Sequence, residues 1–85
     1  MRLTREVRQQ LLDQNEGFEK RTSSSGKNFT EYRHYRITGG QLLIRASGKT
    51  SWADSRFDTG YVGATDDQTR RFLREYLAEL NTDGL

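Results

Sequence analysis

The side chains of this sequence that could do chemistry are arginines, aromatic residues and a few carboxylates, and none of them has the spacing of a catalytic centre. The chain has 85 residues, a single histidine and no cysteine. His34 therefore has no second histidine or thiolate with which to hold a metal ion. No serine lies in a sequence that resembles a nucleophile elbow. We expect no enzymatic activity, no metal and no cofactor.

Two short motifs have simpler explanations than chemistry. Gly48-Lys49-Thr50 has the ending of a phosphate-binding loop, but that loop needs another glycine five residues earlier, where Leu43 stands. Asp58-Thr59-Gly60 matches the aspartic-protease triplet, which requires a second carboxylate to share a proton. We interpret the first motif as a hairpin turn and the second as a turn that follows a strand.

Basic and aromatic residues interleave in the middle of the chain, and this set is the candidate binding site. Aromatic rings stack on bases and guanidinium groups meet phosphates. Trp, Tyr and Arg are also the residues enriched at the energetic centres of protein interfaces. Either use requires that the side chains share one surface. The candidate residues are Tyr32, His34, Arg36, Arg45, Trp52 and Arg56.

Length and composition indicate one small domain, residues 1–85. The charged groups are 14 Lys and Arg against 12 Asp and Glu, which gives a net charge of +2. Such a small excess is a weak indication of a nucleic-acid partner. The apolar runs are too short for a transmembrane helix or a signal peptide, so we expect a cytoplasmic protein without membrane contact.

Hydrophobic periodicity predicts helices at the two ends and strands between them. Thr4 can cap a first helix that stops at Gly17, and Thr65 with Gln68 can form the capping box of a last helix that reaches Asn81. The fold class is therefore α+β: an antiparallel sheet of three to four strands, with an N-terminal and a C-terminal helix packed on it, in the order α-β-β-β-β-α. The expected strands are 18–22, 29–38, 41–47 and 51–57, with 23–26 as a polar loop.

Gly39-Gly40 predicts a two-residue hairpin turn, which fixes the register of the two central strands. Ile37 then pairs with Leu42 and Tyr35 with Ile44 on an apolar face, while His34 pairs with Arg45 on the other face. A second two-residue turn at Gly48-Lys49 would place Trp52 opposite Arg45, and Arg56 opposite Gln41. A change of one residue in that turn would send Trp52 to the core instead, and both registers stay open.

The apolar face and the helices should form the core. The expected core residues are Val7, Leu11, Tyr35, Ile37, Leu42, Ile44, Phe57, Phe72, Leu73, Tyr76 and Leu77.

With three strands, the element order α-β-β-β-α resembles that of double-stranded-RNA-binding domains, but Asp66-Asp67 stands where that family has phosphate-binding lysines at the start of the last helix. A three-stranded sheet followed by a helix, with Arg56-Phe57-Asp58-Thr59 before it, is similar to the arm-binding domains of phage and transposon integrases. That second resemblance implies DNA binding through the sheet.

The sequence favours a non-catalytic binding module that contacts DNA or RNA through the basic and aromatic face. The alternative is a protein-binding adaptor or inhibitor, of the kind that mobile elements encode, which uses the same face. The chain could act as a monomer or as a homodimer.

Overall fold

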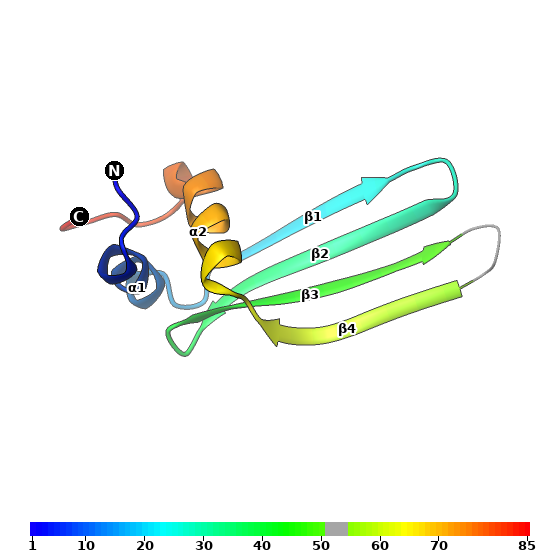
Figure 1. Ribbon diagram of the computed structural model, residues 1–85, viewed down its shortest axis with the longest axis horizontal. Helices are drawn as coiled ribbons and strands as arrows, with labels where there is room; N and C mark the ends of the chain where they lie inside the picture. Colours follow the sequence, from blue (N-terminus) through cyan, green and yellow to red (C-terminus); the bar gives the residue numbers. More distant parts are fainter. Residues whose placement is uncertain (51–54) are drawn as a thin grey trace.

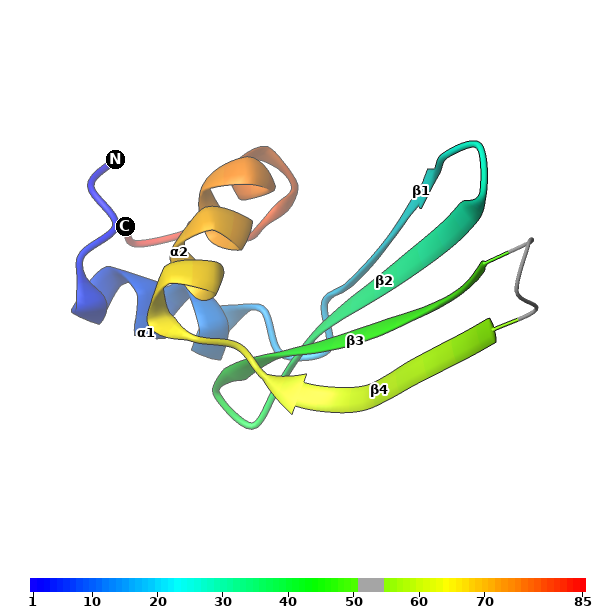
Figure 2. The ribbon, with the colours of Figure 1, turned by 45° about the vertical axis from the view of Figure 1, so that its right-hand side comes forward.

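The computed structural model describes residues 1–50 and 55–85, and it confirms the α+β class with the order α-β-β-β-β-α. Four antiparallel strands form one sheet in the order β1-β2-β3-β4, and both helices gather at one end of it (Figures 1 and 2). The elements are α1 (Arg5–Gln14), β1 (Glu19–Ser25), β2 (Phe29–Thr38), β3 (Gln41–Thr50), β4 (Ser55–Gly63), α2 (Asp66–Glu75) and a short 3-10 helix, η1 (Leu77–Glu79).

Both helices begin at the predicted capping residues. The Thr4 hydroxyl accepts a hydrogen bond from the Val7 N–H. Thr65 and Gln68 form a complete capping box at the start of α2. These bonds satisfy N–H groups that a helix leaves without partners in its first turn. The helix starts are thus set by local sequence.

The β2–β3 hairpin has the predicted register throughout. Gly39 and Gly40 both have positive φ, 62° and 74°, as a type I′ turn requires. Thr38 pairs with Gln41 across the turn, and His34 pairs with Arg45 farther along.

The second predicted turn is wrong. Strand β3 continues through Gly48 to Thr50, and Gly48 pairs with Phe57 of β4. A Cβ at Gly48 would lie 2.8 Å from the Phe57 ring and would also clash with the Thr30 carbonyl oxygen. Gly48 is therefore a strand glycine that makes room for its neighbours.

Without that turn, the residues of the strand predicted at 51–57 have other partners than expected. Arg45 pairs with Tyr61, and Arg56 pairs with Lys49 rather than with Gln41. The predicted strand 51–57 starts at Ser55 among the described residues and runs on to Gly63. Trp52, predicted to face Arg45, lies outside the described residues.

Asp58-Thr59-Gly60 is a β-bulge inside β4 and not a turn that ends a strand. Arg45 pairs with Tyr61 and Ser47 with Asp58, so Thr59 and Gly60 together lie opposite Ala46. Gly60 adopts φ 66°, and the Thr59 hydroxyl accepts the Ala46 N–H at 3.0 Å. The extra residue lets β4 continue with its side chains in register.

The serine triplet also belongs to a strand. Ser23, Ser24 and Ser25 pair with Tyr32, Glu31 and Thr30, so β1 ends three residues later than predicted. The pairing of β1 with β2 is made by backbone N–H and C=O groups, which serine supplies as other residues do. The long β2 strand provides the partner groups.

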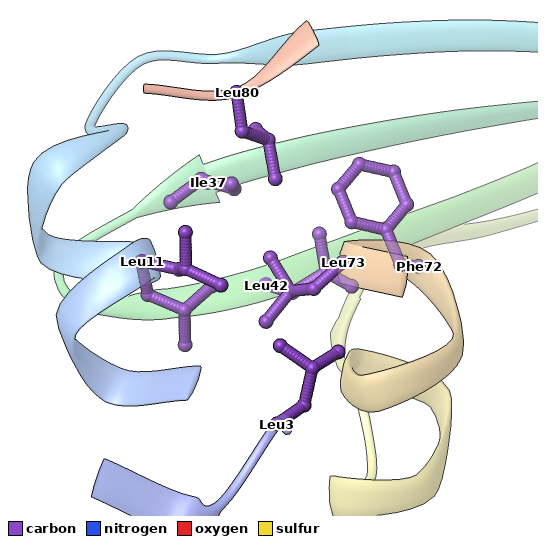
Figure 3. Packing of buried hydrophobic residues seen from close by; sticks show 8 residues of the cluster. Leu3, Leu11, Ile37, Leu42, Phe72, Leu73 and Leu80 are labelled. Carbon is purple, nitrogen blue, oxygen red and sulfur yellow. The ribbon is translucent and has the colours of Figure 1, made fainter. Parts of the chain in front are cut away.

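The hydrophobic core lies at the end of the sheet where the Gly39-Gly40 turn joins β2 to β3, between the sheet and both helices (Figure 3). Ile37 and Leu42, which flank the Gly39-Gly40 turn, are the sheet residues that are fully buried. The buried apolar residues are Leu3, Leu11, Leu12, Ile37, Leu42, Phe72, Leu73 and Leu80, and the partly buried ones packed on them include Val7, Tyr35, Ile44, Tyr76 and Leu77.

The assignment of Phe57 to this core is wrong, since Phe57 is 48% exposed. Its pairing with Gly48 places it on the same face as Leu42, as expected. It lies near the start of β4, and β4 starts at the end of the sheet far from the helices (Figure 1). A helix of 10 residues is about 15 Å long and a strand of 10 residues about 33 Å, so α1 and α2 are too short to cover the whole length of β2 and β3. Leu3, Leu12 and Leu80 join the core in addition to the predicted set.

None of the helices among residues 1–50 and 55–85 is long and apolar enough to cross a membrane.

Candidate nucleic-acid interface

The helices leave the opposite face of the sheet uncovered along its whole length (Figure 2). Side chains alternate between the two faces of a strand, so the residues next to buried Ile37 and Leu42 point away from the core. We call this surface the outer face. Its members with functional groups include Glu19, Arg21, Ser23, Tyr32, His34, Arg36, Arg45, Ser47, Lys49, Arg56, Asp58 and Tyr61.

Five of the six predicted site residues lie on the outer face: Tyr32, His34, Arg36, Arg45 and Arg56. The sixth, Trp52, lies outside the described residues.

The outer face also includes three residues that sequence reasoning missed. Arg21 lies beside His34 because β1 pairs with β2, and Lys49 and Tyr61 belong to it because β3 and β4 are longer than predicted. Tyr61 and Val62, both of residue types favoured in strands, are the sequence signal that could have revealed the longer β4.

Cations outnumber carboxylates on the outer face. Arg21, Arg36, Arg45, Lys49 and Arg56 carry five positive charges against the two negative charges of Glu19 and Asp58. This local excess is larger than the net charge of the whole chain, +2. The cationic excess of the protein is thus concentrated on one surface.

Arg45 and Asp58 form the tightest charge pair of this surface. The Arg45 Nε donates to Asp58 Oδ1 at 2.9 Å, and a second guanidinium nitrogen donates to Oδ2. The Gly60 N–H also donates to Asp58 Oδ1, at 2.9 Å. The guanidinium first, and this N–H second, lower the pKa of Asp58 to about 2. The pair is exposed, so it orients Arg45 more than it stabilises the fold.

Arg45 also lies against Tyr61, which in turn holds His34. The Arg45 guanidinium carbon is 5.9 Å from the centroid of the Tyr61 ring. The Tyr61 hydroxyl forms a 2.6 Å hydrogen bond with His34 Nδ1, and the two rings meet edge to face. On the other side, Glu19 forms an ion pair with Arg36, with 3.3 Å between the carboxylate oxygen and Arg36 Nε. These contacts make the half of the outer face nearest the helices a fixed array.

The half of the outer face far from the helices is more open. Tyr32 is 54% exposed, and a shallow depression of about 550 Å³ lies beside it. That depression is lined by Tyr32, Ser47, Gly48, Lys49, Arg56, Phe57 and Asp58. Lys49, Arg56 and Arg21 have no carboxylate within ion-pair distance among residues 1–50 and 55–85. An aromatic ring with unpaired cations around it can stack on a base and meet the adjoining phosphates.

Comparison with known proteins assigns no function. No family model, no curated protein and no solved structure matches this chain.

A metal site has no support in the part of the chain that the structure describes. No three histidine or carboxylate side chains gather there to hold an ion. His34 Nε2 lies 3.7 Å from Glu19, and Arg36 occupies that carboxylate.

Proposed function

We propose that this protein is a non-catalytic module that binds nucleic acid through the outer face of its sheet, with single-stranded segments as the preferred form. The observation that carries the proposal is the concentration of five cations on the uncovered outer face, which also exposes Tyr32. In this binding mode a base stacks on Tyr32, while Arg21, Lys49 and Arg56 contact phosphates. Stacking on an aromatic side chain requires an unpaired base, which is why single strands are preferred.

The two arginines of the outer face that form ion pairs with carboxylates contribute differently to the proposed binding. Arg36 and Arg45 are already paired with Glu19 and Asp58. A phosphate that approaches them must compete with these carboxylates, so they contribute mainly to the potential of the surface. The cations without such partners should make the direct contacts.

The test is the affinity of labelled DNA and RNA oligonucleotides, single- and double-stranded, measured by fluorescence anisotropy at low salt. A strand of about 16 nucleotides reaches the upper end of the site size of known single-strand-binding domains. Tyr32→Ala should weaken binding by about 5- to 150-fold, since stacking on one aromatic side chain contributes about 1–3 kcal/mol. Tyr32→Phe should retain most of the affinity because it keeps the ring.

Phe29→Ala is the matched control. Phe29 is 47% exposed at the same end of the sheet, but its side chain lies on the opposite face. The proposal requires that Phe29→Ala leave the affinity unchanged. If none of the oligonucleotides binds at low salt, or if both variants lose affinity equally, the proposal is wrong. A purified protein partner that competes for the Tyr32 surface in the absence of nucleic acid would favour the adaptor alternative.

A further inference from the structure

Strand β4 is an edge strand whose outward side is unoccupied among the described residues. It is the last strand of the sheet, and all nine of its residues are exposed. The other edge strand, β1, differs because it ends in three serines and has no exposed large apolar side chain. Phe57, by contrast, exposes nearly half of its surface on β4. An edge with free backbone groups and apolar side chains can pair with another strand.

The ladder shows which backbone groups of β4 point outward. The Leu42 carbonyl accepts from the Ala64 N–H, and the Ala46 N–H reaches Thr59. Even-numbered residues of β3 therefore direct their backbone groups toward β4. Gly48, the partner of Phe57, follows this parity, so Phe57 bonds inward. The N–H and C=O groups of Arg56 and Asp58 then point to the free edge.

We propose that β4 pairs antiparallel with β4 of a second copy of this chain, around a two-fold axis at Phe57. In this register Arg56 of each copy lies opposite Asp58 of the second copy, and the two Phe57 rings meet on the other face. Both hydrogen-bonded positions thus carry opposite charges. An isologous interface needs this kind of self-complementarity, and the triplet Arg56-Phe57-Asp58 supplies it.

The bulge limits how far the pairing extends. Thr59 and Gly60 interrupt the regular strand, so the straight stretch available to the second copy is 55–58. Within it, Asp58 retains an acceptor position on Oδ2 beside the Arg45 contact, because an ionised carboxylate can accept about four hydrogen bonds. The dimer has an eight-stranded sheet with one continuous outer face. The dimer rests on the edge and requires no nucleic acid, but Arg56 takes part both in it and in the proposed nucleic-acid binding.

The register predicts a specific cross-link in the protein without nucleic acid. The chain has no cysteine, so a single introduced thiol can be followed without background. The two-fold axis at a non-hydrogen-bonded pair places the two Cα atoms of position 57 about 4.5 Å apart. That separation lies within the range of disulfides. Phe57→Cys should give a disulfide-linked dimer under mild oxidation, read on a non-reducing gel.

Ser55→Cys is the matched control. Position 55 is also exposed and lies on the same face. In this register, however, it is four residues, or about 13 Å along the strand, from position 55 of the second copy. Ser55→Cys should therefore give no linked dimer above the level of random collision. Equal cross-linking of the two variants, or none with Phe57→Cys, would overturn the proposed register.

A second test exchanges charges across the interface and needs no introduced cysteine. Arg56→Glu puts two carboxylates opposite each other in the dimer, and Asp58→Lys puts two cations opposite each other. Each variant alone should be monomeric by sedimentation equilibrium at a concentration where the unaltered protein dimerises. An equimolar mixture should form a heterodimer, because the charges are again complementary. A mixture that remains monomeric while the unaltered protein dimerises would show that another surface holds the dimer.

Discussion

The salt dependence of nucleic-acid binding gives the sharpest numerical test of the outer face, through the variant Arg21→Ala. Arg21 is a cation of this face without a carboxylate partner among the described residues, and it lies beside His34 in the register of β1 with β2. Each phosphate that a protein cation neutralises releases counterions. For a single strand, the logarithm of the binding constant then falls with the logarithm of the salt concentration by ~0.7 per phosphate.

The structure sets the limits of that slope. If only the three cations without carboxylate partners make contacts, the slope is about −2, and if all five cations of the outer face do, it is about −3.5. Between 50 and 200 mM salt, the affinity of the unaltered protein should therefore fall by about 20- to 130-fold. Arg21→Ala should make the slope shallower by ~0.7.

The assay is an anisotropy titration of one labelled single strand at four or more salt concentrations. Arg74→Ala is the control, since it removes the same charge from the last turn of α2, away from the outer face. Its slope should equal that of the unaltered protein. A loss of slope that is the same for both variants would mean that net charge alone governs binding, which would refute the assignment of phosphates to the outer face.

Three further predictions concern the fold that presents this face. Leu73 is fully buried, so Leu73→Ala should reduce the free energy of unfolding by about 2–5 kcal/mol, measured by denaturant titration; a midpoint equal to that of the parent would contradict the core assignment. The pKa of Asp58 is lowered to about 2 in the folded state, so its contribution to stability is present above the ordinary pKa of about 3.9 and is lost as the pH falls toward 2. Arg45→Ala should raise that pKa toward its ordinary value in an NMR titration, and an unchanged value would contradict the pairing. Gly48→Ala should lower the free energy of unfolding by about 1–3 kcal/mol, because the added Cβ has no room beside the Thr30 carbonyl. A thermal melt measures this loss, and a melting temperature equal to that of the parent would mean that Gly48 has free space, as in a turn.

Local signals in the sequence are enough to define most of the architecture. The capping residues Thr4 and Thr65 act within one helical turn, so the helix starts can be predicted without the rest of the chain. The Gly39-Gly40 turn fixes the β2–β3 register for the same reason, since few residue pairs accept two positive φ angles. That register alone places four of the candidate residues on one face, namely Tyr32, His34, Arg36 and Arg45.

The second hairpin could not be predicted in this way. Gly48 has the composition of a turn residue, but its place in a strand depends on Phe57, which lies across it, and on the close approach of Thr30. The bulge at Thr59 and Gly60 shifts the later part of β4 by one residue, and period-two patterns do not show such a shift. Tyr61 joins the candidate site because of this shift and because β4 is longer than predicted.

The exposure of each face was decided only by the tertiary structure. The alternation of apolar and polar residues assigned Phe57 to the face that packs on the helices, and its side chain does lie on that face. Whether a helix reaches it depends on the length of α1 and α2 relative to the strands, and on where the two helices pack. For β2 and β3, the amino-acid order alone predicts which side chains share a face, because alternation is a property of one strand and its turn. Which part of each face is covered is a property of how separate elements pack, and this leaves the outer face and the β4 edge free to bind.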